Sequence, residues 1–154
     1  MDVLESNGCE TTKVLKSSSI SIGTLEIYLA CTEYNSGENE NGIIILAKHG
    51  NFEMVVTGDV GIKSEREYAA LLNLPDIEVI IAGHHGSKGS TGERLLDACT
   101  PEAAIISVGA NSYGHPAEET LERFAQRKIL VYRTDDMGEI TFKDLETLEK
   151  RYGG

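Results

Sequence analysis

Two short apolar runs limit the fold of this chain more than any other feature. Residues 77–83 ("IEVIIAG") and 103–109 ("AAIISVG") are continuous runs of the kind that form buried strands. Segments whose apolar residues have helical spacing lie before, between and after these runs. Strands that alternate with helices are typical of a sheet with parallel neighbours and covering helices. The sequence therefore predicts an α/β fold.

The segments on either side of this region predict further strands. Residues 17–30 alternate apolar and polar positions on both sides of Gly23, which indicates two strands. Residues 43–47 and 52–56 predict a hairpin, and its turn, "HGN", contains His49 as a turn residue. An Asn-, Glu- and Gly-rich segment before this hairpin predicts an exposed loop. After it, "ILVYRT", the turn "DDMG" and the strand "EITF" complete a mixed sheet.

Local signals also predict where the helices begin and end. Two Ser-x-x-Glu capping boxes, at Ser64 and Ser90, predict the starts of two helices. Pro75 is expected to end the first of them. A third helix is predicted to open at Pro116, because proline suits the first helical turn.

Length, charge and cysteine content narrow the possible classes of protein. The 154 residues suit a single domain, 1–154, with flexible ends expected at 1–16 and 143–154. The sequence has no apolar run of the roughly 20 residues that span a membrane, and its N-terminus has no signal-peptide pattern. The formal net charge of −11 opposes a broad basic surface for nucleic acid. The three scattered cysteines indicate small buried or half-buried thiols.

Three polar, glycine-containing loops follow the predicted strands: "TGDV", "GHHGSKGS" and "GANSYGHP". If the strands are parallel neighbours, these loops meet at one edge of the sheet, where α/β folds bind their ligands. Asp59, His84, His85 and His115 would then lie together, and a carboxylate with imidazoles suits zinc, manganese or iron. Taken singly, Asp59 and His115 could instead cap helices, and the paired histidines could be a polar strand end. Ser87, Lys88 and Ser90 are candidates for contact with a substrate phosphate, or form a solvated loop.

The same motifs carry a family resemblance. "NGIIILAKHGNFEMVVTGDV", "IEVIIAGHHGSKGS", "AAIISVGANSYGHP" and "VYRTDDMGEITF" resemble, in order and spacing, the metallo-β-lactamase-like domain of the ComEC family of DNA-internalisation competence proteins. The likeness runs from about Ser17 to Phe142. It implies the C-terminal half of an αββα sandwich, with a mixed sheet and covering helices. It also implies a metal-dependent hydrolase, proposed in the family to degrade the DNA strand that is not transported.

The resemblance assigns expected roles to individual residues. It implies that Asp59 bridges zinc or manganese ions and that one of His84 and His85 is a metal ligand, without saying which. It places His115 at the rim of the active site, in reach of a phosphate or leaving group, and so makes it the catalytic candidate. The implied partners are single-stranded DNA and the rest of a membrane channel protein, of which this would be a soluble domain.

One departure from the family leaves the activity open. The H-x-[HD]-x-D-H motif, which supplies most metal ligands in the superfamily, is absent from the sequence. The chain therefore resembles a partial domain, and we expect the isolated chain to be inactive. Two alternatives remain: a non-enzymatic packing or interaction module derived from this fold, and a hydrolase for another phosphoester.

Overall fold

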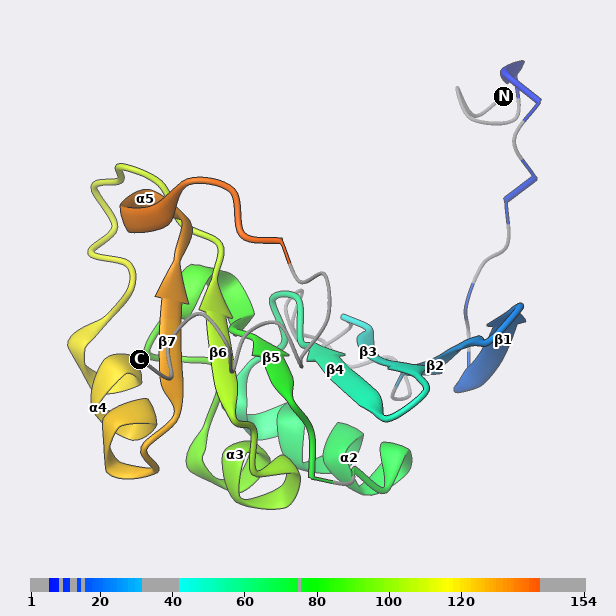
Figure 1. Ribbon diagram of the computed structural model, residues 1–154, viewed down its shortest axis with the longest axis horizontal. Coiled ribbons are helices and arrows are strands. Elements are labelled where there is room, and N and C mark those ends of the chain that lie inside the picture. The colour runs from blue at the N-terminus through cyan, green and yellow to red at the C-terminus, as the bar shows by residue number, and fades with distance from the viewer. Residues whose placement is uncertain are drawn as a thin grey trace.

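A seven-stranded mixed sheet forms the centre of the computed structural model (Figure 1). The structure describes residues 6–8, 10–11, 14, 16–31, 42–74 and 76–141. Within these ranges the strands are β1 (Ser18–Ile22), β2 (Leu25–Ala30), β3 (Ile44–His49), β4 (Phe52–Val56), β5 (Val79–Ile81), β6 (Ala103–Ile106) and β7 (Leu130–Arg133). Residues 32–41, for which a loop was predicted, Pro75, and the two ends at 1–5 and 142–154 lie outside the described residues.

The strands lie side by side in the order in which they occur along the chain. Strands β1 to β4 pair antiparallel, and the pairing of β3 with β4 is the predicted hairpin. Strands β4 to β7 pair parallel, and Met54, Val79 and Ala103 occupy matching positions on neighbouring strands. The first and second halves of the sheet therefore have different pairing, and only the parallel half brings successive strand ends to a common edge.

Helices cover one face of this sheet. The covering helices are α2 (Ile62–Leu72), α3 (Glu93–Cys99) and α4 (Glu118–Gln126). Two shorter elements follow strands: a 3₁₀ turn, η2 (Gly83–Gly86), after β5, and a single helical turn, α5 (Thr134–Met137), after β7. Tyr68, Leu95 and Phe124 of the three longer helices are fully buried in one core cluster with Ile80 and Ile106 of the sheet. None of the described helices has the length and apolar character needed to cross a membrane.

The opposite face of the sheet carries a smaller apolar cluster. Val79, Ala103 and Ile105 are its buried members, and they alternate along β5 and β6 with residues of the main core. Phe52 and Met54 of β4 pack against them from the neighbouring strand. Both faces of the parallel half are thus apolar, which explains why residues 77–83 and 103–109 read as continuous apolar runs.

These observations confirm the predicted α/β class with a mixed sheet and covering helices. The two strands predicted within 17–30 and the hairpin at 43–56 are confirmed, and β4 has the predicted bounds. The other strand boundaries differ from the prediction. Strand β5 is only three residues long, because the chain leaves the extended conformation after Ile81 and enters η2.

The two predicted capping boxes are wrong. Helix α2 begins at Ile62 and helix α3 at Glu93, each behind a glycine N-cap that makes no side-chain capping bond. Ser64 is a buried residue inside α2. The physical reason at α3 is a tertiary contact: the carboxylate of Glu65 accepts the backbone N–H of Gly92, 2.7 Å away, and so replaces a local cap.

The start of α4 and the C-terminal segment also differ from the prediction. Helix α4 begins at Glu118, two residues beyond Pro116, because the N–H of Ala117 is bonded to Gly86 O instead. The predicted turn "DDMG" lies mostly in α5, and residues 139–141 form no strand. The hydroxyl of Thr134 accepts the N–H of Val108 and donates to its carbonyl, which holds α5 at the end of β6.

Candidate functional site

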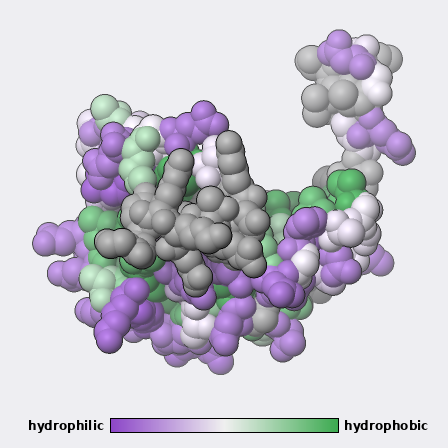
Figure 2. Space-filling view, in the orientation of Figure 1, coloured by the Kyte–Doolittle hydropathy of each residue, from purple (hydrophilic) through white to green (hydrophobic). Residues whose placement is uncertain are grey.

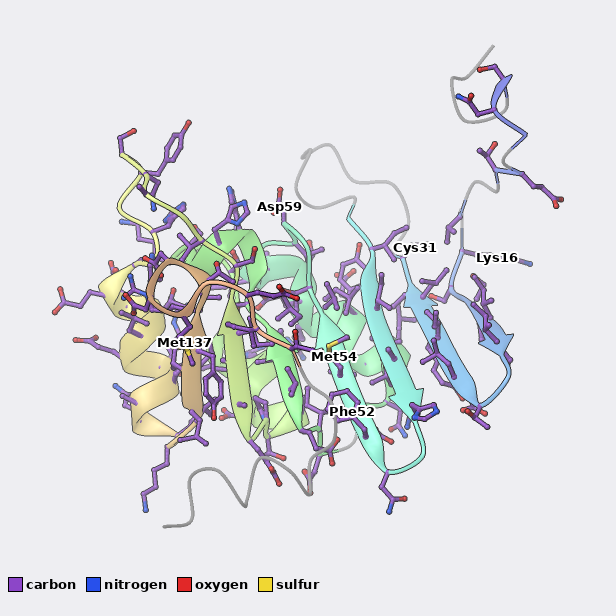
Figure 3. All side chains as sticks on the ribbon, turned by 45° about the horizontal axis from the view of Figure 1, so that its top comes forward. Lys16, Cys31, Phe52, Met54, Asp59 and Met137 are labelled. Atoms are coloured by element: carbon purple, nitrogen blue, oxygen red, sulfur yellow. The ribbon has the colours of Figure 1, made fainter. Side chains whose placement is uncertain are left out.

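The three polar loops lie at the carboxyl ends of neighbouring parallel strands. Asp59 follows β4, the paired histidines follow β5, and His115 lies in the loop after β6. Figure 3 shows Asp59 at the edge of the sheet opposite the end where Phe52 begins β4. The N–H of His84 donates to Gly58 O, 2.9 Å away, which ties the first two loops together directly. The loops therefore lie at one edge of the sheet, as expected for neighbouring parallel strands.

The paired histidines occupy a left-handed turn. His84 has φ 49° and ψ 46°, and His85 has φ 55° and ψ 30°, a conformation that residues with a Cβ seldom adopt. Glycines flank them where a side chain would not fit. A Cβ on Gly83 would lie 2.8 Å from Thr57 Oγ1, and a Cβ on Gly86 would lie 2.7 Å from Pro116 Cβ. The "GHHG" motif is thus required by packing against the neighbouring loops on both sides.

The two histidine side chains have different surroundings. The ring of His84 is half-buried and meets the ring of His115 edge-on, with centroids 5.8 Å apart and an interplanar angle of 66°. The ring of His85 is exposed, and its Nδ1 lies 2.6 Å from Ser107 O. A carbonyl can only accept, so Nδ1 carries a proton in this contact, and in the neutral ring Nε2 then keeps its lone pair. Histidine ligands of metals are commonly oriented by this kind of bond.

A single asparagine shapes the loop that carries His115. The side chain of Asn111 donates to Gly109 O and His115 O, and accepts the N–H groups of Tyr113 and His115, at 2.8–3.1 Å. Sequence reasoning missed Asn111, although its place in a Gly- and Ser-rich loop is a recognised signal for such turns. Tyr113 is 83% exposed and its ring is stacked on that of His115, with centroids 6.3 Å apart. The Nδ1 atom of His115 is buried and has no hydrogen-bond partner among the residues that the structure describes.

The loops at this edge carry side chains of the types that bind metals. Asp59 is exposed at the edge, beside the loop that carries two imidazoles, and this donor chemistry suits zinc or manganese. Among the residues that the structure describes, however, no group of three or more His, Cys, Asp or Glu side chains is placed to hold an ion. Catalytic metal sites generally use about three protein ligands per ion. Asp59 and the histidines are therefore suitable metal ligands by type, but they are too few to form a complete ligand set.

The three candidates for phosphate contact have unequal access to solvent. Lys88 is exposed and Ser87 is half-buried. Ser90 is 1% exposed, so its side chain cannot meet a phosphate without a rearrangement of the loop. Its backbone carbonyl accepts a bond from Arg123, 2.9 Å away. Only Lys88 and Ser87 remain accessible candidates.

The fold and the position of these loops define a class, the α/β domains with a mixed sheet and polar loops at its carboxyl edge. No family model matches the chain. Comparison with individual proteins does identify a family. The chain is 34% identical over 109 residues to ComE operon protein 3 of Bacillus subtilis, covering 70% of the chain and 14% of that protein. It is 36% identical over 104 residues to Recombination protein 2 of Haemophilus influenzae, covering 67% of the chain and 13% of the relative.

A third relative is Competence protein ComA of Neisseria gonorrhoeae, 34% identical over 111 residues, which covers 70% of the chain and 16% of that protein. Over these residues the chain belongs to the ComEC family, as its motifs predicted. It spans about one seventh of the length of the relatives it matches. Among solved structures, a mutant of CmlA beta-hydroxylase superposes with a TM-score of 0.49 at 11% identity, over 77% of this chain and 31% of that one.

Proposed function

We propose that this chain is part of a metal-dependent hydrolase domain that acts on DNA phosphodiester bonds when its ligand set is complete. The observation that carries the proposal is the meeting of the Asp59 loop with the His84–His85 turn at the carboxyl edge of β4 and β5. A carboxylate beside imidazoles is a donor set for zinc or manganese. One of the relatives bears the name competence protein, which supports a role connected with DNA uptake.

Within that domain, the contacts favour His85 over His84 as the metal ligand. His85 has its Nδ1 bound to Ser107 O, so the lone pair of Nε2 is free and its ring orientation is fixed. The ring of His84 packs against His115 instead. Asp59 is exposed and has two carboxylate oxygens, which suits a bridging ligand. We therefore assign the metal to Asp59 and His85, with His84 supporting the ring of His115.

His115 and Lys88 are the groups placed to act on a substrate. A bound metal would polarise the phosphoryl group and lower the pKa of a water molecule. His115 would exchange a proton with the leaving oxygen, because an imidazole can donate and accept protons near neutral pH. Lys88, an exposed residue of the loop that carries His84 and His85, would contact the phosphate by charge. Asn111 would hold His115 in place through its four hydrogen bonds.

We also propose that the purified chain binds metal weakly and does not cleave DNA efficiently. Much of the affinity of a metal site comes from several ligands that are already in position. The described residues offer one carboxylate and one oriented imidazole at this edge. The net charge of −11 adds a repulsion between the chain and a polyanionic substrate.

Metal analysis of the purified protein, together with a single-stranded DNA cleavage assay supplemented with zinc or manganese, tests the proposal. We expect substoichiometric metal, reduced further by Asp59→Ala and by His85→Ala. The matched control is Asp97→Ala, which removes an exposed carboxylate from α3 and should leave the metal content unchanged. Metal content unaffected by Asp59→Ala and His85→Ala would contradict the site. Two tightly held ions per chain, or cleavage abolished by Asp59→Ala, would contradict the weak-binding part of the proposal.

A further inference from the structure

Thr91 is held in an unusual backbone conformation at the end of the "GSKGST" loop, residues 86–91. It is fully buried and has φ 51°, in the left-handed region that β-branched residues rarely enter. Such a conformation persists only where the surrounding structure imposes it, and it is found most often at functional sites. The contacts of Thr91 therefore identify what holds this loop.

All three polar groups of Thr91 are bonded to residues of other elements. Its N–H donates to the buried carboxylate of Glu65 on α2. Its carbonyl accepts from the guanidinium of Arg123 on α4, 3.3 Å away. Its hydroxyl accepts the N–H of Gly83, 2.9 Å away. Gly83 is the residue immediately before His84, so Thr91 connects the two helices to the start of the histidine turn.

Arg123 holds more of the loop than Thr91 alone. Its guanidinium also donates to Lys88 O, at 2.7 Å, and to Ser90 O, at 2.9 Å. Three donors from other elements bind the remaining carbonyl oxygens of the loop. The carbonyls of Gly86, Ser87 and Gly89 accept bonds from Ala117 N, Thr120 Oγ1 and Ile62 N respectively, at 2.9–3.0 Å. Every carbonyl oxygen from residue 86 to residue 91 is thus hydrogen-bonded, which leaves the loop little freedom.

We propose that Arg123 and Thr91 are positioning residues for the His84–His85 turn: Arg123 fixes the loop around Thr91, and the Thr91 hydroxyl fixes Gly83. The turn itself is left-handed at both histidines, so it needs contacts from outside to stay in one conformation. The proposal rests on the proposed function only for the consequence that an ordered turn presents a metal-binding imidazole. The hydrogen bonds that carry it do not depend on any activity.

The first test compares Thr91→Val with Thr91→Ser. Valine keeps the shape of the side chain and removes the acceptor for Gly83 N–H, whereas serine keeps that acceptor. Amide hydrogen exchange is measured by NMR on the chain without metal or DNA, and the free energy of unfolding is measured in urea. We expect Thr91→Val to speed exchange at Gly83 and in the turn by about threefold to tenfold, the value of one buried hydrogen bond. Thr91→Ser should remain close to the wild type. Equal exchange in the two variants would overturn the proposal.

The second test uses Arg123 of α4 and Arg127, the residue that follows this helix. Arg123→Met should speed exchange across residues 83–91, and Arg123→Lys should restore part of the protection, because lysine keeps a donor but loses the fork that spans several carbonyls. Arg127→Met is the matched control, since Arg127 lies one turn further on and pairs with Asp97 at the surface. It should leave residues 83–91 unchanged.

The outcomes of the second test separate positioning from overall stability. If Arg123→Met does not fold, the comparison of Arg123→Lys with Arg127→Met decides. Faster exchange confined to residues 83–91 supports the proposal. Uniformly faster exchange throughout the chain, or unfolding of both Arg123 variants, would overturn it, because Arg123 would then stabilise the whole fold. Since metal and DNA are absent, a failure of the proposed hydrolase function would leave this result unaffected.

Discussion

Glu65 shows how one buried side chain can replace a local capping signal. It is 1% exposed, and its two carboxylate oxygens accept the N–H groups of Thr91 and Gly92 at the start of α3. Burial raises the pKa of Glu65 above its ordinary value of 4.5, and the two N–H groups and Arg123 offset part of this effect. Folding therefore favours the protonated form of this carboxyl group. Its contribution to stability is greatest below pH 4.5 and is lost as the pH rises through the raised pKa.

The neutral variant Glu65→Gln tests this linkage. We expect the free energy of unfolding of the wild type, measured relative to Glu65→Gln, to fall as the pH is raised from below 4.5. Urea unfolding at a series of pH values measures the difference. Glu67→Gln is the matched control, because it removes a carboxylate from the exposed face of the same helix. If the difference in free energy of unfolding between the wild type and Glu65→Gln stays constant or rises with pH, the pKa of Glu65 is not raised by folding.

Cys99 gives a second prediction at the scale of a residue. Its side chain is fully buried, and burial raises the pKa of its thiol to about 12. Alkylation requires the thiolate, so native Cys99 should resist iodoacetamide at pH 8, whereas half-buried Cys31 should react faster. Peptide mass spectrometry after timed labelling measures both rates. Labelling of Cys99 as fast in the native protein as in urea would show that its site is open.

At the scale of an element, the histidine turn depends on its glycines. A Cβ on Gly86 would lie 2.7 Å from Pro116 Cβ, and Gly86 has φ 80°. Gly86→Ala should lower the free energy of unfolding by about 2–5 kcal/mol, the sum of left-handed strain and overpacking. Chemical denaturation measures the change. Gly109→Ala is the control, because Gly109 has no neighbour within 4 Å of an added Cβ, and it should change stability by at most about 0.5 kcal/mol. Similar losses in both variants would contradict the packing argument.

Elements also differ in how well the sequence predicts them. The hairpins of β1 with β2 and of β3 with β4 follow from alternation and turn residues, which are local properties. The starts of α2 and α3 do not follow from local sequence signals. The bonds that replace the expected caps join residues far apart in sequence, such as Glu65 and Gly92 at a separation of 27. The same holds for Arg123, which no sequence motif marks and which lies 33 residues from its partner Ser90.

At the scale of the whole molecule, the dominant property is charge. The chain has 25 acidic and 14 basic residues, and Figure 2 shows mainly hydrophilic residues on the visible surface outside the grey region. Like charges on a compact body repel one another, and unfolding relieves this repulsion. The native state should therefore gain stability when the repulsion is screened.

Thermal unfolding at increasing salt tests this expectation. The Tm should rise with NaCl, with most of the rise complete by about 0.15 M, where the Debye length is about 8 Å. KCl at equal ionic strength is the control, because screening depends on ionic strength and not on the identity of the cation. A Tm that falls as NaCl is added, or that responds to only one of the two salts, would contradict net repulsion as the cause.

The order of apolar runs and polar loops by itself determined the α/β class, the mixed sheet and the edge at which Asp59, the paired histidines and His115 lie. These features follow from periodicity and strand order, which are readable along the chain. Only the tertiary structure decided the left-handed histidine turn, the different surroundings of His84 and His85, and the burial of Ser90. The physical reason is that these depend on hydrogen bonds and close contacts supplied by other elements, from Gly58, Thr91, Ser107 and Arg123. No local pattern around the histidines specifies those partners.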